Sequence, residues 1–304
     1  MKENLIIAAV GDRSFHRSWI KGKNRLFDVL LIYYGNESGK YLGDADYYLE
    51  TQVVGKFQKI FLAIEKYHEE VSCYKYVCLA DDDIISSTDA FNRLFEKFNH
   101  YGLDAGQPSI SGGFIGHWIT TRHWGCELRY VNFVEGMCPV FKSGLLLQEI
   151  LPYLIANRSA WGIEWLWASV LVNKKVAILD CVSVRHKSFL DSAFCMLFHH
   201  KSDYYLSLRR TGVSIEKDMK DAAESVAPEI RKSLFLEKGR IRKPLGLRIL
   251  LSPLMLYGLT KWTLYFMIIK HFDNFFLLAN KILFKFKGSP GLSAVNNKTG
   301  RART

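Results

Sequence analysis

The sequence predicts an α/β domain with a mixed, mainly parallel sheet flanked by helices, followed by an α-helical C-terminal appendage. Over the first two thirds of the 304 residues, short continuous apolar runs alternate with segments whose apolar residues recur at helical spacing. Strands that are apolar on both faces are typical of parallel sheets whose two faces are covered by helices. Beyond about residue 190 this alternation stops.

The first hundred residues give the clearest elements. Apolar runs predict strands at residues 4–10, 27–35 and 74–80, and apolar residues at helical spacing predict helices at residues 55–70 and 88–101. In parallel sheets ligands collect at the carboxyl ends of the strands. The loops that follow these strands are therefore the first places to look for a site.

The middle of the chain is less regular. Residues 102–124 are rich in Gly, His and Trp without clear periodicity, which is typical of a functional loop region or a small β insertion. After them, strands are expected at residues 129–141 and 174–188, and helices at residues 142–157 and 159–171. The chain is expected to divide into a main domain at residues 1–190, a helical connector at 191–240, basic aromatic membrane-associating helices at 241–288 and a flexible tail at 289–304.

Charge and cysteine content narrow the function classes. The formal net charge of +11 indicates an anionic partner. Nearly all of the excess positive charge lies from residue 221 onward. Nucleic-acid binding is therefore not suggested for the main body. The six cysteines show no zinc-like spacing, and the apolar run near the N-terminus is too short for a signal peptide, so we expect a cytosolic, reducing compartment.

Three consecutive aspartates, Asp81, Asp82 and Asp83, end the third apolar run. Like charges about 4 Å apart repel by roughly 4 kcal/mol at an effective dielectric constant near 20, so something must offset that repulsion. Helix capping or plain solvation could do so, but the hydroxyl residues at 86–88 are nearer caps for the next helix. Asp81 and Asp83 alternate along an extended chain and so face one side, where their oxygens suit Mg²⁺ or Mn²⁺.

A strand followed by Asp-x-Asp resembles the metal-binding signature of GT-A glycosyltransferases, which transfer sugars from nucleotide-diphosphate donors. The neighbouring segments strengthen the resemblance, because they look like those of a bacterial and plant family of such transferases: "VGKFQKI", "YKYVCLADDDI", "AGQPSIS", "NFVEGMCPVF", "WGIEWLW" and "VAILDCVSVRHKS". The resemblance covers about residues 4–188, and the chain departs from the family's usual continuation after His186. It implies a GT-A fold for residues 1–190, a nucleotide-diphosphate sugar as donor, and Mn²⁺ or Mg²⁺.

The resemblance also implies roles for the acidic residues. Asp81 and Asp83 would hold the cation, His186 at the end of the last strand would complete its ligands, and Asp82 or a water would lie near the ribose. A surface histidine in a basic turn is the alternative for His186.

Further nucleotide contacts are expected from two places in the sequence. Lys56 opens a helix, from where its ammonium group can reach a diphosphate, although a solvated lysine is the alternative. Gly11, Asp12 and Arg13 follow the first strand and are expected to contact the nucleotide, with Arg13 as the charged contact.

Two glutamates compete for the role of catalytic base. Glu164 follows a Trp-Gly turn and opens a helix, where inverting GT-A enzymes commonly place the acid that deprotonates the acceptor hydroxyl. Glu135 interrupts an apolar strand and is expected in the same cleft, binding acceptor or sugar hydroxyls. Salt bridges are the structural alternative for both. His117, His123 and the tryptophans of this region are expected to be mainly structural.

The segment at residues 249–269 approaches the roughly 20 apolar residues that span a bilayer, but Lys261 and Pro253 oppose insertion. A basic aromatic hairpin lying on an anionic membrane surface explains the pattern better, and a packed helical subdomain is the alternative. The basic residues that precede the segment are Lys238, Arg240, Arg242, Lys243 and Arg248.

The sequence therefore predicts a metal-dependent, inverting glycosyltransferase that is cytoplasmic and peripheral on the inner face of the membrane. Its acceptor would be a glycan or lipid-linked molecule in cell-surface polysaccharide or lipopolysaccharide assembly. A nucleotidyltransferase of related fold and a non-catalytic membrane-surface adaptor are the alternatives.

Overall fold

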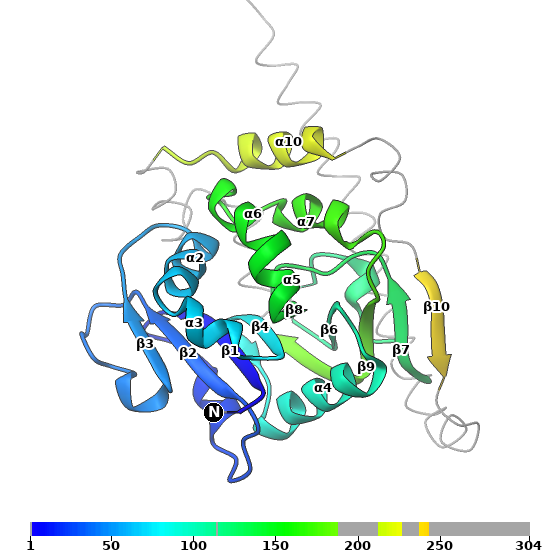
Figure 1. Cartoon of the computed structure of the whole chain (residues 1–304), viewed down its shortest axis with the longest axis horizontal. Helices are drawn as coiled ribbons and strands as arrows, with labels where there is room; N and C mark the ends of the chain where they lie inside the picture. The colour runs from blue at the N-terminus through cyan, green and yellow to red at the C-terminus, as the bar shows by residue number, and fades with distance from the viewer. Residues whose placement is uncertain (1, 114, 188–211, 227–236, 243–304) are drawn as a thin grey trace, which may run out of the picture. The chain divides into compact units, whose positions relative to one another are not determined.

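The apolar runs of the sequence form the strands of one sheet (Figure 1). The computed structural model describes residues 2–113, 115–187, 212–226 and 237–242, which all belong to one compact unit, residues 1–244. The strands are β1 (Asn4–Val10), β2 (Asp28–Tyr33), β3 (Tyr47–Glu50), β4 (Tyr76–Asp81), β5 (Ile84–Ile85), β6 (Ala105–Ile110), β7 (Cys126–Val131), β8 (Val140–Lys142), β9 (Val176–His186) and β10 (Glu237–Arg242).

The sheet is mixed and mainly parallel, as the sequence predicts. The strand order is β10-β7-β9-β6-β8-β4-β1-β2-β3, with β5 paired to β9 off this path. β1 runs parallel to β2 and β4, β2 to β3, and β6 to β9. β8 lies antiparallel between β4 and β6, and β7 is antiparallel to β9 and β10.

Helices lie on both sides of this sheet (Figure 1). A π-helical turn at Leu146–Ile150 joins two of them into one continuous segment. Short 3-10 turns lie at Leu42–Asp44 and Trp118–Thr120. The helices are α1 (His16–Ile20), α2 (Lys56–Lys66), α3 (His68–Ser72), α4 (Thr88–Tyr101), α5 (Ser143–Leu145), α6 (Leu151–Ala156), α7 (Ile163–Leu171) and α10 (Ile215–Ser225).

The central strands are buried on both faces, which explains their continuous apolar sequences. In β1, Leu5 and Ile7 pack in one core with α2, α6 and α7. The intervening residues Ile6, Ala8 and Val10 pack in a second core with α1 and α4. Both faces of the sheet are covered by helices. A ligand can therefore reach the sheet only at the edge where the parallel strands end.

Helix α4 begins and ends at the residues that its sequence signals predict. The Ser87 side chain accepts a hydrogen bond from Ala90 N at 3.2 Å, and Gly102 closes the helix with a φ of 59°, which favours glycine. The aspartates at 81–83 are therefore not needed to cap α4.

Two expectations for the middle of the chain are wrong. Residues 102–124 contain a regular strand, β6, whose sequence "AGQPSI" lacks an apolar run because it buries Gln107 and Ser109. The single strand expected at 129–141 is divided into β7 and β8, and Glu135 lies in the buried loop between them rather than within a strand.

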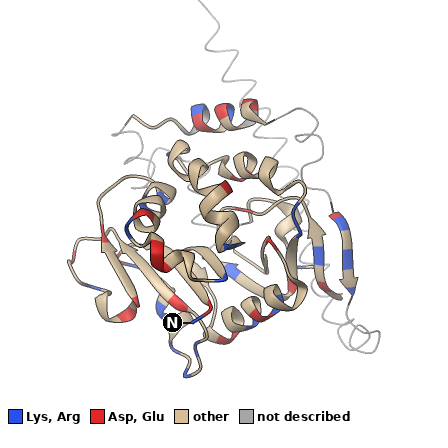
Figure 2. Ribbon diagram, viewed as in Figure 1, with Lys and Arg blue, Asp and Glu red and all other residues tan. Residues whose placement is uncertain are grey.

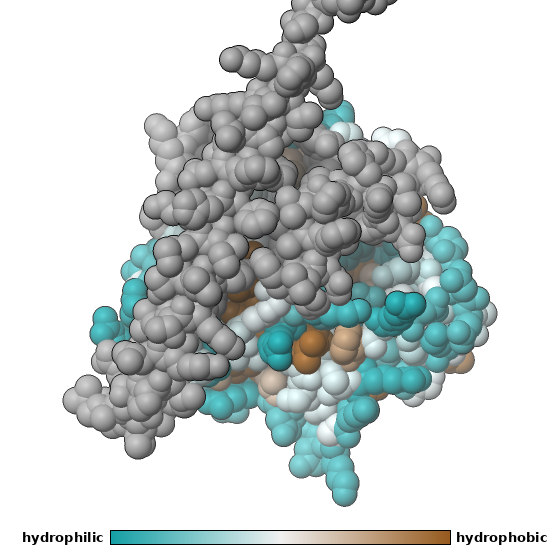
Figure 3. Space-filling model, turned by 180° about the vertical axis from the view of Figure 1, so that it is seen from behind, coloured by the Kyte–Doolittle hydropathy of each residue, from teal (hydrophilic) through white to brown (hydrophobic). Residues whose placement is uncertain are grey.

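The described parts of the C-terminal third pack on the main domain. Residues 237–242 form β10, although 237–240 are expected in a helical connector and 241–242 in membrane-associating helices. The alternate residues Lys238, Arg240 and Arg242 are exposed (Figure 2). Among the described helices, none is long and apolar enough to cross a membrane. The described surface in Figure 3 is mostly hydrophilic with small apolar patches. The rest of the expected membrane-associating helices, residues 243–288, and the expected tail at 289–304 lie outside the described residues.

Candidate active site

The acidic cluster lies at the carboxyl edge of the sheet, as expected. Asp81 is the last residue of β4, and Asp83 immediately precedes β5. β5 pairs antiparallel with the end of β9, where Ile84 lies opposite His186. The ligand atoms of Asp81, Asp83 and His186 all lie within 4.8 Å of one another. The structure thus brings together the three residues expected to hold a cation.

Two positive groups offset the negative charge of the cluster. Lys56 Nζ lies 2.5 Å from Asp81 Oδ1, and His186 Nε2 lies 3.1 Å from Asp83 Oδ1. Burial raises the pKa of Asp81 even though the charge of Lys56 opposes the shift. Burial lowers the pKa of His186, but the hydrogen bond and charge of Asp83 outweigh burial and raise the pKa to about 9. Lys56 and His186 are therefore the groups that balance the charge of the carboxylates.

These residues also fit a divalent cation in their donor chemistry. Among the described residues, Asp83 Oδ1 is buried with no hydrogen-bond donor other than the His186 ring. His186 Nδ1 lies 3.1 Å from the Lys187 carbonyl oxygen, which only accepts, so Nδ1 carries a proton there. In a neutral ring this leaves the Nε2 lone pair for a metal ion, the arrangement common in histidine ligands. Mn²⁺ accepts this mixed oxygen and nitrogen set well, and Mg²⁺ accepts the carboxylates.

Asp82 faces away from the other two aspartates, toward the ends of β1 and β2. Its Oδ2 accepts hydrogen bonds from Gly11 N at 2.9 Å and from the Tyr34 hydroxyl at 3.2 Å. Burial raises the pKa of Asp82 to about 6, although these two hydrogen bonds lower it. Lys59 lies nearby with its ammonium group 4.6 Å from the centre of the Tyr34 ring. Burial lowers the pKa of Lys59 to about 8, although the charge of Asp82 acts in the opposite direction.

The loop after β1 makes contacts with two neighbouring parts of the protein. Gly11 contacts Asp82 directly. The Asp12 carboxylate instead accepts a 2.5 Å hydrogen bond from the Tyr33 hydroxyl and weaker ones from Asn36, so it holds the loop after β2. Arg13 is exposed.

Lys56 begins α2 as expected, but its ammonium group is committed to the acidic cluster. In addition to Asp81, it donates a 2.7 Å hydrogen bond to the Gly136 carbonyl oxygen. Gly136 belongs to the loop that runs beside the end of β4, where Asp81 N donates to Met137 O at 2.8 Å. The loop that carries Glu135 is thereby fixed against the aspartates.

Glu135 is buried just beyond this contact. Its backbone N donates to Gln107 Oε1 at 2.5 Å, and its Oε2 lies 3.0 Å from the Thr120 hydroxyl. Burial raises the pKa of Glu135 to about 7, the nearby charge of His117 lowers it, and that of Glu164 raises it.

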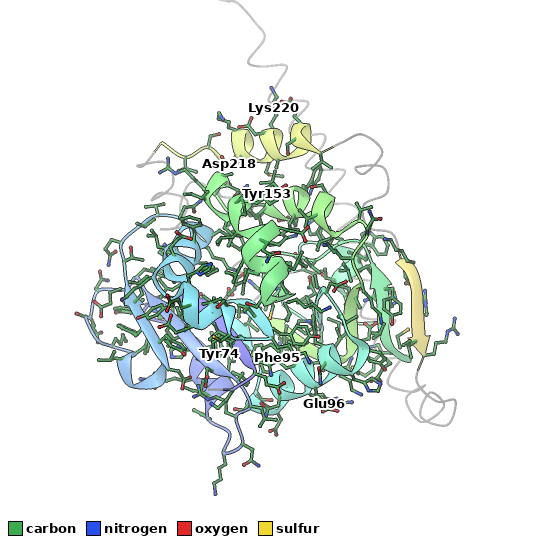
Figure 4. All side chains as sticks on the ribbon, viewed as in Figure 1. Tyr74, Phe95, Glu96, Tyr153, Asp218 and Lys220 are labelled. Carbon is green, nitrogen blue, oxygen red and sulfur yellow. The ribbon has the colours of Figure 1, made fainter. Side chains whose placement is uncertain are left out.

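Glu164 lies in the first turn of α7, where sequence analysis expects it. The preceding Gly162 has a φ of 79°, and an added Cβ would meet Ala222 Cβ at 3.2 Å, so a glycine is required at this point. Asp218 of α10, labelled in Figure 4, accepts a 2.7 Å hydrogen bond from Ser159 N in the same turn. Helix α10 thus helps to hold the turn that presents Glu164.

The fold brings three further side chains to this edge that the sequence does not predict there. His117 lies 3.3 Å from Glu164 Oε1, whereas the sequence predicts a mainly structural histidine. Tyr34 and Lys59 meet at Asp82. Lys59 follows Lys56 by three residues on a helix, and this spacing is the one signal that could have indicated it.

Comparisons with known proteins give remote structural matches. No protein-family model and no curated protein sequence matches the chain. S. aureus TarS matches with a TM-score of 0.46 and 10% identity over 77% of this chain, which spans 50% of that chain. A form of TarS, residues 1–349 in complex with UDP-GlcNAc, matches with a TM-score of 0.45 and 11% identity over 77% of this chain and 84% of that chain. A protein assigned as a nucleotide-diphospho-sugar transferase from Desulfovibrio desulfuricans G20 matches with a TM-score of 0.39 and 11% identity over 73% and 99% of the two chains.

Proposed function

We propose that the protein transfers a sugar from a nucleotide-diphosphate donor to a glycan or lipid-linked acceptor in a metal-dependent reaction. The observation that carries this proposal is the meeting of Asp81, Asp83 and His186 at the carboxyl edge of the sheet, where α/β sheets bind their ligands. An acidic and imidazole ligand set at this edge suits a cation that also binds phosphate oxygens.

Each residue has a distinct task in the donor complex. Asp81, Asp83 and His186 hold Mn²⁺ or Mg²⁺, which when bound would neutralise negative charge on the diphosphate leaving group. The Lys56 ammonium group leaves its ion pair with Asp81 and binds the phosphate oxygens of the donor. An ammonium group binds phosphate as a point charge. Gly11 and Asp82 contact the nucleotide.

Glu164 is the base that accepts the proton of the acceptor hydroxyl. The hydroxyl oxygen bonds to the anomeric carbon as the bond between that carbon and the diphosphate oxygen breaks. The electron pair of the broken bond leaves on the diphosphate. Direct displacement of this kind inverts the anomeric centre, and a positioned base contributes on the order of 10² to 10⁴ in rate.

The charge distribution supports a membrane-linked acceptor. Nearly all of the excess positive charge follows residue 221, and the exposed cations of β10 alternate along an edge strand. Basic segments are attracted to anionic lipid. The proposal therefore includes peripheral attachment to the inner face of the membrane and a role in cell-surface polysaccharide or lipopolysaccharide assembly.

A thermal-shift panel of nucleotide sugars, with and without Mn²⁺, tests the proposal. A ligand that binds the folded state raises its stability by mass action, so we expect a raised Tm when a nucleotide sugar and the cation are both present. Release of free nucleoside diphosphate on adding extracts that contain acceptor would follow. If no nucleotide sugar changes the Tm at any cation concentration, the proposal is wrong.

One double variant separates the alternatives. Replacing both Asp81 and Asp83 by Ala should abolish turnover and cation-dependent nucleotide binding in a transferase, but should leave a membrane-surface adaptor functional. A nucleotidyltransferase would instead release pyrophosphate from a nucleoside triphosphate.

A further inference from the structure

A second group of ionisable side chains lies beside the aspartates and is not needed to hold the cation. His117 Nε2 lies 3.3 Å from Glu164 Oε1, and the His117 ring stands edge-on to Phe133 with 4.7 Å between centroids. Glu135 completes the group through Thr120. The members come from the loop after β6, the loop after β7 and the first turn of α7, so only the folded chain assembles them.

The Thr120 hydroxyl is relevant to the protonation state of Glu135. Thr120 Oγ1 lies 2.8 Å from the His117 carbonyl oxygen and 3.0 Å from Glu135 Oε2. A carbonyl oxygen only accepts, and a threonine hydroxyl has a single proton to donate. If that proton goes to His117 O, the contact with Glu135 is a hydrogen bond only when the carboxyl group itself carries a proton. The two contacts share one donor, so a proton on Glu135 would complete the second hydrogen bond.

Burial favours the protonated form of Glu135, whereas the nearby charges act in both directions: Glu164 raises its pKa, and His117 and His186 lower it. Glu135 is 5% exposed, and the ionisable groups that act on it are His117, Glu164 and His186. Burial raises the pKa of Glu135 to about 7. Burial alone would lower the pKa of His117, but the hydrogen bond to Glu164 and the charges of Glu135 and Glu164 outweigh burial and raise it. Burial thus favours the protonated form of Glu135, whereas the pairing with Glu164 favours the protonated form of His117.

We propose that His117 is a positioning residue that pairs with Glu164, and that Glu135 is held beside them as a buried acid, so that the three side chains form one proton-accepting unit. The proposal rests on the sugar transfer proposed above and assigns to that reaction two residues besides the base. His117 holds Glu164 ionised and oriented. While Glu135 is neutral, it leaves the charge of His117 to Glu164 alone, and once ionised it shares that charge and makes Glu164 a stronger base.

The unit has a definite pH response. When Glu164 accepts the proton of the acceptor hydroxyl, the net charge of Glu164, His117 and Glu135 together increases by one. Once Glu135 has ionised, that added charge is compensated, so Glu164 becomes a stronger base. Turnover should therefore rise as the pH passes through about 7, and it should rise through Glu135.

Titration of the His117 ring by NMR tests the pairing without any substrate. We expect His117 to lose its proton at a lower pH in Glu164→Gln than in the unmodified chain, because the variant removes a negative charge 3.3 Å away. His68, which is exposed, serves as the reference signal and should not move. Identical His117 titration in the two proteins would overturn the pairing, whether or not the chain transfers sugars.

Kinetics of two matched pairs of variants test the role in the reaction. His117→Gln should lower turnover on the order of tenfold or more and move the acidic limb of the pH–rate profile to higher pH, while cation-dependent nucleotide binding stays intact. Glu135→Gln keeps a neutral donor for Thr120, so it should retain turnover within about threefold at pH 6 and lose the rise near pH 7. Glu135→Ala should lose turnover at both pH values. His68→Gln and Glu96→Gln, both at exposed positions, are the controls.

The outcomes separate this inference from the proposed function. Loss of turnover in Glu135→Gln equal to that in Glu135→Ala would show that the ionised carboxylate is essential and would overturn the inference. A pH–rate profile unchanged in His117→Gln would also overturn it. Absence of nucleotide-sugar binding by the unmodified chain would instead count against the proposed function, and the NMR titration would still decide the pairing.

Discussion

His186 Nε2 lies 3.1 Å from Asp83 Oδ1, although 103 positions separate the two residues in the chain. The antiparallel bridge between β5 and β9 brings them together, because it pairs Ile84 with His186 directly. Lys187 N also donates to Asp83 O at 3.0 Å. The backbone thus fixes this contact from both sides, so the ligand set is built into the sheet rather than into a movable loop.

The first prediction concerns the ligands themselves. Asp81→Asn or Asp83→Asn should abolish the Mn²⁺-dependent rise in Tm, because an amide oxygen without charge is a much weaker ligand for a hard cation. Without the cation, Asp81→Asn should be at least as stable as the unmodified chain, because burial penalises the charged form of Asp81. Differential scanning fluorimetry with graded Mn²⁺ measures both effects.

Asp89→Asn is the matched control for the charge change, since Asp89 is an exposed aspartate in the first turn of α4. It should respond to Mn²⁺ as the unmodified chain does. A normal response in Asp81→Asn and Asp83→Asn would mean that the cluster does not bind the cation.

The second prediction uses two adjacent glycines. Gly113 has a φ of 83°, and a Cβ there would collide with the carbonyl oxygen of His186. Gly113→Ala should therefore cost about 1–3 kcal/mol of stability and weaken cation binding by displacing His186. In Gly112, a Cβ would meet only Arg185 Nε, at an ordinary 3.5 Å. Gly112→Ala should bind Mn²⁺ normally in the same titration, and equal effects of the two variants would contradict this explanation.

The sequence predicts the parts of this site that follow directly from strand ends. The apolar runs before Gly11, Asp81 and His186 are long and clear, so the strands and the residues after them can be placed. The common edge then follows from the rule that parallel strands carry ligands at their carboxyl ends. Glu164 is likewise placed by a glycine turn before an apolar helix.

The contacts that depend on irregular segments could not be predicted. His117 lies 47 positions before Glu164 in a stretch without periodicity, and nothing local indicates their pairing. Strand β6 is hard to predict because it carries Gln107 and Ser109 where a buried strand usually has apolar residues. Ser109 donates a hydrogen bond to β9, and Gln107 accepts one from Glu135 N, so both partners are supplied by distant parts of the chain. The sequence predicts a strand around Glu135 because its neighbours are apolar, but they are buried by the packing of a loop against α7.

The third prediction concerns Lys56 and the diphosphate. Lys56→Gln should weaken binding of a nucleoside diphosphate by roughly 10- to 100-fold, the range expected for loss of a hydrogen bond to a charged group. Binding of the corresponding nucleoside, which lacks phosphates, should be unchanged. Isothermal titration calorimetry in saturating Mn²⁺ measures both.

Lys66→Gln, at the exposed end of the same helix, is the control and should bind both ligands normally. If Lys56→Gln weakened binding of the nucleoside as much as that of the diphosphate, Lys56 would not contact the phosphates.

The last prediction is a pH dependence of stability that comes from Glu135. Its pKa is about 7 in the folded protein and near the ordinary 4.5 in the unfolded chain, because burial disfavours its charged form. The folded state therefore binds the proton more tightly. The resulting stabilisation is fully present below pH 4.5 and is lost as the pH rises to about 7. A difference of about 2.5 pKa units corresponds to about 3 kcal/mol.

Urea unfolding at a series of pH values isolates this contribution. Glu135→Gln removes the titration, so the free energy of unfolding of the variant relative to the unmodified chain should increase by about 3 kcal/mol between pH 4.5 and pH 8. Glu96→Gln, an exposed substitution of the same kind, should show no such change. A constant difference between the unmodified chain and Glu135→Gln across this range would mean that Glu135 is already ionised at low pH. In that case Thr120 would have to donate its proton to Glu135 rather than to the His117 carbonyl oxygen, 2.8 Å away.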